Sequence, residues 1–429
     1  MRIKRLDLTN FRSFDRKIFE FQDQFNLLIG DNGTGKTAIL DALAVAAGSL
    51  FLGFDELNSR HIHVDEVRRV PYTKEGLTSV EPQYPVHVRA EGQIAGSSLR
   101  WNRSLQLSGG RTSRVGTKGA ADVARKLLQE VRAGRDVDLP LVSYYGTGRL
   151  WLQKKAKTVE PVKPGSRLLG YVDCLDPASS LKPVLRWWKT MEFVQLQEGK
   201  KIEPFDAIKS ALKECLERWE DVWYDVRRDD LYARAADGRE LPFHMLSDGV
   251  RNMLGMVADI AYRAAVLNPH LGPGVARKTP GIVLIDEIDL HLHPKWQRRV
   301  VDDLRRTFPE IQFIATTHSP FIVQSLRPGE LINLDMPAAA GAEHRSIEDI
   351  AEEDMGVALP QRSKRWREMM QTAEEYYRLL RSAEGASGEE KARAKVKLDT
   401  LLAPFSDDPA YVAFLKMERA AAGLGGGEP

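Results

Sequence analysis

The segment from Gly30 to Thr37 constrains this chain more than any other, because it reads GDNGTGKT and matches the pattern G-x-x-x-x-G-K-[ST]. It follows the apolar run at residues 25–29 and opens a helical pattern that begins at Thr37. In this strand–loop–helix context, such a loop wraps phosphate groups with its backbone N–H groups. Glycines are needed because the backbone approaches the anion closely and takes positive φ values. The segment therefore predicts a phosphate-binding loop.

The last two residues of this loop carry its chemistry. We expect Lys36 to neutralise the β- and γ-phosphates and the Thr37 hydroxyl to ligate Mg²⁺. The N-terminus of the following helix adds about half a positive charge facing the anion. The alternative, a glycine-rich turn with an incidental lysine, does not account for the strand before the loop and the helix after it.

A second segment, residues 281–287, reads GIVLIDE and describes a buried strand that ends on two carboxylates. The carboxyl end of a strand is where ligands bind in an open α/β sheet. We expect Asp286 to join the Mg²⁺ shell and Glu287 to orient and deprotonate the attacking water. His318 follows another apolar run, residues 311–316, and is expected to contact the γ-phosphate. The alternative is an ordinary surface or core histidine whose hydrogen bonds are made within the protein and which has no catalytic role.

The sequence LSDGVR at residues 246–251 precedes an apolar helical pattern at 253–267. Ser247 is expected to be the N-cap of this helix, and Gly249 to keep its start open to an anion. An ordinary capped helix is the alternative.

Apolar runs at residues 139–145, 281–285 and 311–316 alternate with helical patterns at 253–267 and 296–308. This alternation predicts an α/β core with parallel strands. Residues 181–223 read as helical and aromatic, and residues 222–231 read as a short strand. The four tryptophans are expected to be core residues, and platforms for nucleic-acid bases are the alternative, because Lys182, Arg186 and Lys189 lie nearby. Residues 346–422 read as a charged helical tail.

The composition leaves the class of partner open. Lys and Arg number 62 and Asp and Glu number 60, which gives a formal net charge of +2. This balance excludes a histone-like polycation but permits nucleic-acid binding through a local patch. Two cysteines, Cys174 and Cys215, suit a reducing compartment. With no signal peptide and no run of about 18 apolar residues, we expect a cytoplasmic protein with no membrane segment.

In this order, the motifs resemble those of an ABC-type ATPase head of the RecF/SMC/OLD class. The opening segment NFRSF at residues 10–14 strengthens the resemblance. Ser247–Arg251 then corresponds to the ABC signature, with Asp248 in place of the more usual glycine. Asp286 and Glu287 correspond to the Walker B pair, and His318 to the switch histidine. The resemblance covers residues 1–50 and 240–335 well and the middle loosely.

The resemblance implies an α/β fold with a P-loop NTPase core built on a mixed sheet. It divides the chain into an N-terminal ATPase lobe (1–150), an inserted helical and β lobe (151–240), a C-terminal ATPase lobe (241–340) and a helical tail (341–429). It also implies ATP as substrate, Mg²⁺ as cofactor, and a homodimer or higher oligomer with ATP between the heads. The ATP contacts implied are Arg12, Asn32, Gly33, Thr34, Gly35, Lys36 and Thr37 of one chain, and Ser247 and Gly249 of the other.

The tail and the segment at residues 143–149 look similar to PtuA-like ATPases of bacterial anti-phage systems. That similarity implies control of a separately encoded nuclease, with an HNH type favoured. We find no Toprim pattern after His318, so we expect no nuclease within this chain. The alternative is a RecF-like repair ATPase that clamps DNA when ATP binds. A membrane-transporter ATPase fits the NFRSF start poorly.

Two further features suggest a binding site but also have an ordinary structural interpretation. His291 and His293 suggest a zinc site, but the string LHLHP is what this ATPase class carries after the Walker B pair. The basic cluster at residues 362–367 suggests a nucleic-acid contact, and a solvated helix face is the alternative.

Overall fold

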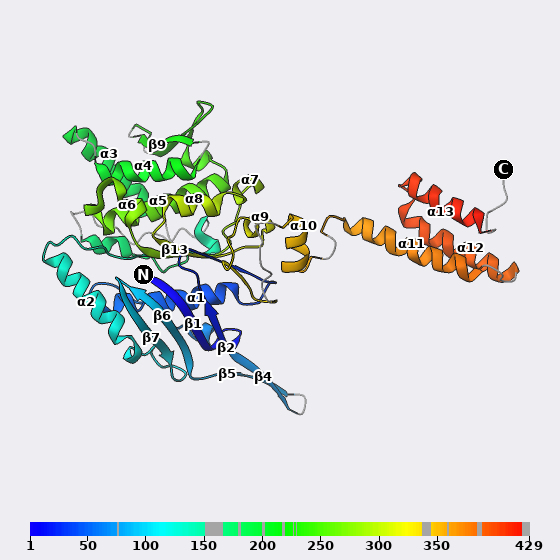
Figure 1. The fold of residues 1–429 in the computed structure, drawn as a ribbon, viewed down its shortest axis with the longest axis horizontal. Helices are drawn as coiled ribbons and strands as arrows, with labels where there is room; N and C mark the ends of the chain where they lie inside the picture. The colour runs from blue at the N-terminus through cyan, green and yellow to red at the C-terminus, as the bar shows by residue number, and fades with distance from the viewer. Residues whose placement is uncertain are drawn as a thin grey trace. The chain divides into compact units, whose positions relative to one another are not determined.

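The structure is a computed structural model of the chain. It describes residues 1–74, 77–150, 166–178, 182–199, 202–216, 219–225, 227–228, 230–336, 345–357, 360–383 and 388–422. The chain divides into two compact units, Met1–Met355 and Gly356–Pro429. Figure 1 shows sheets and helices in the first unit and helices in the second. The finer division at residues 150, 240 and 340 stays a prediction.

A five-stranded sheet forms the centre of the first unit. Its spatial order is β14-β3-β13-β12-β8, and every neighbouring pair is parallel. Its strands are β3 (Phe25–Ile29), β8 (Leu141–Tyr145), β12 (Gly281–Ile285), β13 (Ile311–Thr316) and β14 (Leu331–Asn333). All residues of the first four are buried, which explains their continuous apolar runs. The predicted α/β core with parallel strands is confirmed, and β14 is an addition to it.

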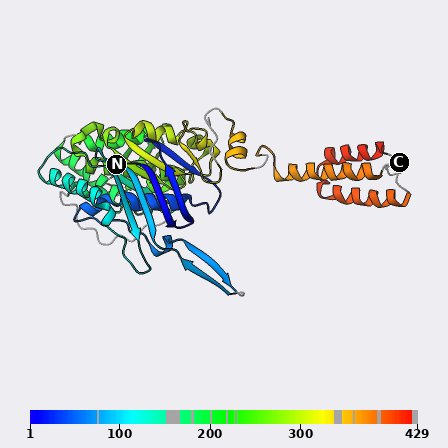
Figure 2. The ribbon, with the colours of Figure 1, turned by 60° about the horizontal axis from the view of Figure 1, so that its bottom comes forward.

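The expected mixed sheet is in fact two separate sheets. A second, antiparallel sheet has the order β2-β1-β6-β7. Its strands are β1 (Arg2–Phe11), β2 (Phe14–Glu20), β6 (Val86–Ile94) and β7 (Ser97–Leu105). A hairpin of β4 (Arg69–Lys74) and β5 (Leu77–Pro82) extends from this part of the unit (Figure 2). Alternating burial along β6 shows that one face of the antiparallel sheet covers the core.

Helix α1 (Lys36–Ala47) lies between the two sheets and contacts strands of both. Helix α5 (Asp248–Leu267) packs against β8 and α4, away from the antiparallel sheet (Figure 1). The remaining elements of the first unit are α2 (Lys118–Arg132), α3 (Lys182–Glu198), α4 (Glu203–Cys215), β9 (Trp219–Asp225), β10 (Asp230–Ala235), β11 (Glu240–Pro242), α6 (Val275–Lys278), α7 (Pro294–Gln297), α8 (Val300–Thr307), α9 (Pro320–Val323) and α10 (Ile347–Asp349).

Some predicted helices differ from the observed elements. The helical pattern predicted over residues 181–223 ends at Cys215, and Trp219 and Trp223 lie on strand β9 instead. The predicted helix at 296–308 is divided into α7 and α8. Tryptophan and tyrosine favour strands as readily as helices when a sheet partner is available, and β10 supplies that partner. The Lys- and Pro-containing stretch at residues 151–170 also predicts a loop, but residues 151–165 lie outside the described residues.

The tryptophans on α3 are core residues, as predicted. Trp188 has no exposed surface, and its ring meets the ring of Phe205 edge-on with 5.2 Å between centroids. Trp187 packs edge-on against Phe205 and Tyr262. Trp188 therefore has no face free to stack on a base, whereas Trp187 is half-buried against the core.

The second unit contains α11 (Lys364–Ala383), α12 (Gly388–Leu402) and α13 (Pro409–Ala421), packed around a small core that includes Tyr376, Leu398 and Leu415. The helical tail is therefore confirmed for its described residues. Within the basic cluster at its start, Arg365 pairs with Asp407, and Lys364 lies 3.7 Å from Glu368. These pairs favour the solvated-face alternative for two of the four cations.

One stretch, Lys36–Gly53, is long and apolar enough to cross a membrane by length and composition. It is 89% buried inside the unit, and its helical part is α1. The core position of this helix accounts for its hydropathy.

Helix α5 carries a buried ion pair that fixes the chain segment beside it. The Arg263 Nε donates to Asp259 Oδ2 at 2.7 Å, and the Arg263 Nη1 donates to the carbonyls of Gly170 and Val172 at 2.9 and 3.0 Å. The Tyr145 hydroxyl on β8 also donates to Asp259, at 2.7 Å. Both charged side chains are about 5% exposed or less. The pair therefore joins α5, β8 and the segment at 167–172.

We predict that Arg263→Met lowers the free energy of unfolding of the first unit by roughly 3 kcal/mol, because it leaves the Asp259 carboxylate buried without a counter-charge. Urea denaturation followed by tryptophan fluorescence measures the change. The control is Arg100→Met, because Arg100 is 82% exposed in its pair with Glu91. An equal loss in both variants contradicts the prediction.

Candidate functional site

The carboxyl ends of β3, β12 and β13 open into one cavity of about 500 Å³. Nine of the residues predicted for the site line it: Arg12, Asn32, Gly33, Gly35, Lys36, Thr37, Asp286, Glu287 and His318. Parallel strands place all their carboxyl ends at one edge, so residues from both halves of the chain meet there. The structure thus brings most of the predicted residues together.

The loop between β3 and α1 has a backbone that only glycine adopts readily. Gly33 and Gly35 have φ angles of 88° and 101°. A Cβ on Gly35 would lie 2.6 Å from the ring of Phe14 and 2.9 Å from the Ser13 hydroxyl. Gly35 therefore lets the NFRSF segment pack directly onto the loop. Thr34 is not among the lining residues, and its hydroxyl donates to the Asp31 carbonyl at 3.0 Å.

Lys36 points into its own loop. Its Nζ donates to the carbonyls of Gly30 at 2.7 Å and Asp31 at 2.9 Å. Burial lowers the pKa of Lys36, and the carboxylates of Asp335 and Asp286 oppose this effect. The ammonium is thus already inside the cradle that the loop forms, where it can meet a phosphate.

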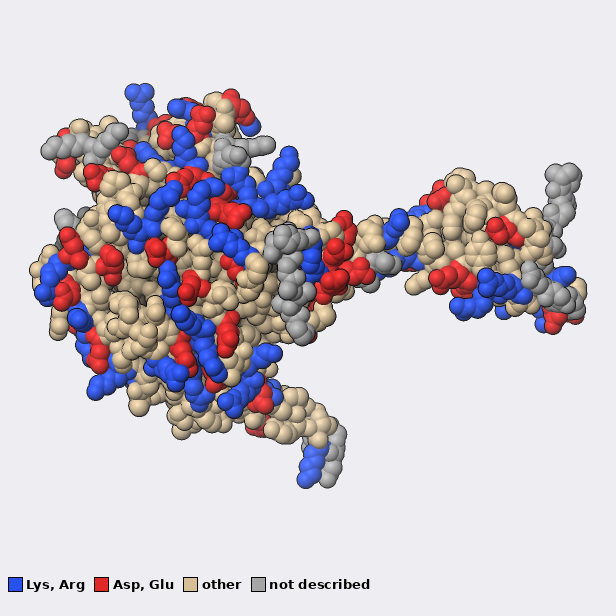
Figure 3. Space-filling view, in the orientation of Figure 1, with Lys and Arg blue, Asp and Glu red and all other residues tan. Residues whose placement is uncertain are grey.

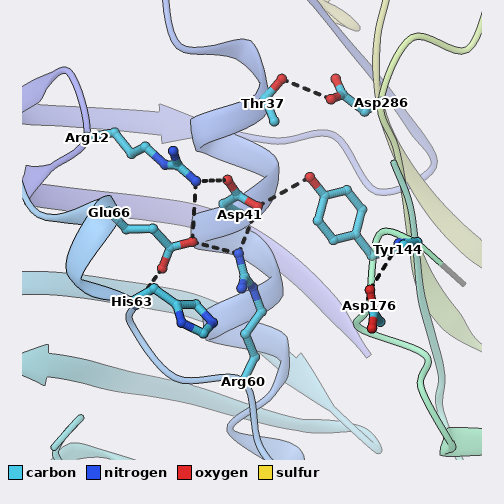
Figure 4. Close-up of polar contacts among 10 residues, drawn as sticks. Arg12, Thr37, Asp41, Arg60, His63, Glu66, Tyr144, Asp176 and Asp286 are labelled. Atoms are coloured by element: carbon cyan, nitrogen blue, oxygen red, sulfur yellow. Dashed lines mark hydrogen bonds and ion pairs between the residues drawn. The ribbon is translucent and has the colours of Figure 1, made fainter. Parts of the chain in front are cut away.

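A hydroxyl and a carboxylate face each other on the other side of the cavity. The Thr37 hydroxyl donates to Asp286 Oδ2 at 2.9 Å (Figure 4), and the Thr316 hydroxyl donates to Asp286 Oδ1 at 2.7 Å. Oxygen donors of this kind suit Mg²⁺, which commonly takes one or two protein ligands and completes its shell with phosphates and water. Thr37 and Asp286 therefore fit the predicted metal site.

Glu287 stands in a strained conformation next to Asp286. Its φ angle is 49°, in the left-handed region that a glutamate rarely adopts. Its N–H donates to the Thr316 hydroxyl at 2.7 Å, so β13 helps to hold this turn. Strain of this kind is common where a side chain must be aimed at a reacting group. The side chain lines the cavity together with His318, which is exposed just beyond the end of β13.

Ser247 and Gly249 do not join this cavity. They line a second cavity of about 800 Å³, next to His291, His293 and Trp296. Ser247 is the N-cap of α5, but its side chain makes no capping hydrogen bond. A Cβ on Gly249 would lie 2.4 Å from the His291 carbonyl oxygen, so this glycine allows close packing of the helix. The expected opening of this helix start toward an anion stays a prediction.

The histidines proposed for zinc have other surroundings. The Nδ1 of His293 accepts the Lys295 N–H at 3.2 Å and caps α7. Among the described residues, no group of three or more His, Cys, Asp and Glu side chains could hold a metal ion.

The sequence interpretation missed Asp335, which buttresses the phosphate loop. Its Oδ2 accepts the Asp31 N–H at 2.6 Å, and the Leu334 N–H donates to the Ile29 carbonyl at 3.0 Å. The signal was present, because LINLD at residues 331–335 repeats the pattern of IVLID at residues 282–286. Six other lining residues were also missed: Ser13, Ala38, Asp65, Val67, Arg69 and Thr316. Ser13 lies within the NFRSF segment and Ala38 directly follows the phosphate-loop motif, whereas no local motif marks the other four.

Comparison with known proteins agrees with this geometry. A family model described as an AAA domain matches residues 5–220, just over half of the chain. A second AAA domain model, whose description also names the AbiEii toxin and a Type IV TA system, matches residues 231–324. Residues 221–230 separate the two matches, which together cover both parts of the cavity.

Individual relatives come from several kinds of protein. The "Retron Vc95 probable ATPase" of Vibrio cholerae serotype O1 biovar El Tor is 24% identical over 382 residues, covering 76% of this chain and 72% of the relative. Septu protein PtuA of Bacillus thuringiensis is 33% identical over 144 residues, covering 30% of this chain and 35% of PtuA. A solved SMC head domain from Thermotoga maritima is 15% identical, with a TM-score of 0.41 over 77% of this chain and 94% of that one.

The first family match extends over more than half of the chain and includes the whole phosphate loop. The chain therefore belongs to the AAA domain family and is an ATPase.

Proposed function

We propose that this ATPase hydrolyses ATP between two copies of the chain and thereby controls a separately encoded nuclease in bacterial anti-phage defence. The observation that carries the catalytic part is the convergence of Lys36, Thr37, Asp286 and Glu287 on one cavity. The defence role is supported by the retron and Septu relatives.

Each side chain has a distinct task in hydrolysis. The loop N–H groups and Lys36 hold the β- and γ-phosphates, and Lys36 exchanges its two carbonyl partners for phosphate oxygens. Thr37 and Asp286 would hold Mg²⁺, which supplies charge neutralisation of the phosphates when bound. Glu287 orients the attacking water and accepts its proton, and His318 contacts the γ-phosphate. The strained turn at Glu287 keeps the carboxylate directed into the cavity.

Two copies are part of the proposal because Ser247 and Gly249, which the resemblance assigns to ATP, line a different cavity from Lys36. Ser247 is exposed at the start of the 20-residue helix α5, with a side chain that makes no capping bond. A helix N-terminus of this length attracts an anion. In the proposed assembly, it meets the γ-phosphate bound by the other copy.

Nucleic acid is a further proposed partner. On the face drawn in Figure 3, Lys and Arg are interspersed with Asp and Glu, in keeping with the net charge of +2. Binding through such a surface depends on local clusters and weakens with salt. The alternative is that the partner nuclease, and not this chain, contacts the nucleic acid.

We predict that Lys36→Ala abolishes ATP binding, because the loop loses the cation that pairs with the phosphates. Glu287→Gln keeps ATP binding but abolishes hydrolysis, because only the proton acceptor is lost. Binding of a fluorescent ATP analogue and phosphate release with Mg²⁺ measure the two effects. Glu310→Gln is the control. Glu310 precedes β13, at the end of the strands opposite the cavity, so this variant is expected to keep wild-type ATP binding and hydrolysis. Wild-type hydrolysis by Glu287→Gln contradicts the assignment.

A mixing experiment tests the two-copy site. Lys36→Ala inactivates the phosphate loop of a copy and leaves its signature segment intact. Ser247→Arg inactivates the signature segment and leaves the phosphate loop intact. Each variant alone is inactive, but a mixed dimer contains one intact composite site. An equimolar mixture is therefore expected to regain about a quarter of the wild-type ATPase activity. No recovery, in a mixture whose exchange of subunits is verified, contradicts hydrolysis between copies.

The partner is tested by affinity purification of the Glu287→Gln protein from its native host with ATP present. We expect a nuclease to co-purify, because the trapped ATP state holds the assembly together. The Lys36→Ala protein is the control, since it cannot reach that state. Recovery of DNA with repair proteins and no nuclease favours the RecF-like alternative.

A further inference from the structure

Four charged side chains form a cluster beside the phosphate loop (Figure 4). Asp41 on α1 accepts hydrogen bonds from Arg12 Nη2 and Arg60 Nη2, both at 2.8 Å. Glu66 accepts from Arg60 Nη2 at 2.6 Å and lies 3.7 Å from Arg12 Nη2. Two carboxylates therefore face two guanidinium groups, and the cluster has no net charge.

The carboxylates are buried and depend on their partners. Asp41 is 5% exposed and Glu66 is 1% exposed. Burial raises the pKa of Glu66, and the charge of Arg60 opposes this effect. The Tyr144 hydroxyl on β8 also donates to Asp41, at 3.4 Å. Buried carboxylates with this many donors hold their geometry firmly, because each lost bond would leave a charge unpaired.

Arg12 is the only member of the cluster that lines the nucleotide cavity among the described residues. Its backbone is fixed as well: its φ angle is 52°, and its N–H donates to the Glu66 carbonyl at 2.7 Å. The adjacent Phe11 forms a β-bridge with Val67. Backbone and side chain of Arg12 are therefore both tied to the segment at 64–67.

The cluster uses only part of the Arg12 guanidinium. Its hydrogen bond runs through Nη2, and among the described residues no partner contacts Nε or Nη1. A guanidinium has five N–H donors, so donors remain for an anion. The side chain is 40% exposed, on the side where the cavity opens. The Arg12 guanidinium is thus held through Nη2, and its Nε and Nη1 donors remain available to an anion.

We propose that Asp41 and Glu66 are positioning residues that hold Arg12 ready to bind a phosphate oxygen of ATP. The inference rests on the proposed function, because it takes ATP as the ligand of the cavity. An arginine fixed before binding loses little conformational entropy when the nucleotide arrives, so it contributes more to affinity than a mobile one. Neither carboxylate touches the cavity, so both act through Arg12.

The test is a double-mutant cycle on the full chain. We expect Asp41→Asn to raise both the Kd of a fluorescent ATP analogue and the KM for ATP about tenfold, with kcat unchanged, because the amide keeps the volume but loses the charge that holds the guanidinium. In an Arg12→Ala background, Asp41→Asn is expected to raise the Kd no further, since nothing is left to position. Glu66→Gln is expected to behave in the same way.

Asp259→Asn is the matched control. Asp259 is also buried on a helix and also accepts hydrogen bonds from an arginine and a tyrosine, but none of these residues lines the nucleotide cavity. This variant is expected to lower the melting temperature while leaving the Kd for ATP unchanged. The pair of variants separates loss of positioning from loss of stability.

Three outcomes overturn the inference. An unchanged Kd in Asp41→Asn, in a protein whose ATP binding Lys36→Ala abolishes, overturns the inference alone. An equal rise in Kd with and without Arg12 assigns Asp41 a structural role and also overturns it. Absence of saturable ATP binding by the wild-type protein overturns the proposed function and this inference with it.

Discussion

Strand β3 pairs in parallel with β13, with Thr316 opposite Leu28, and β13 pairs in parallel with β12. Because the three strands run in one direction, the loop after β3 and the carboxylates after β12 must emerge at the same edge. The hydrogen bond from Thr37 to Asp286 joins two residues that are 249 positions apart in the sequence. Without this pairing, the chain would contain the site residues but no site.

The parts of the fold that could be predicted are those with a local signature. Buried parallel strands appear as continuous apolar runs, and the phosphate loop has a fixed glycine spacing, so β3, β12, β13 and the loop were all identified from the sequence. Strand β14 was missed because it has only three residues, although residues 331–335 repeat the pattern of residues 282–286. Trp219 of β9 was assigned to a helix because strand preference depends on a partner strand that the local sequence does not specify.

The same distinction applies within the site. Lys36, Thr37, Asp286 and Glu287 lie in motifs, and the structure places them around one cavity. Asp41 lies in the middle of an apolar helix, and Glu66 lies in a loop, so neither is distinguishable from an ordinary acidic residue in the sequence. Their relation to Arg12 exists only when β1, α1 and the loop at 60–66 are packed together. Tertiary contacts of that kind produce no periodic pattern in the sequence.

The close packing of Gly249 has a mechanical consequence. The first turn of α5 rests on the His291 carbonyl, and Asn252 Nδ2 donates to the Leu290 carbonyl at 2.9 Å. The same short segment begins with Asp286 and Glu287, so the carboxylates are connected to the start of α5 through residues 286–292. In a two-copy assembly, displacement of the carboxylates at one nucleotide therefore shifts the helix that meets the other nucleotide.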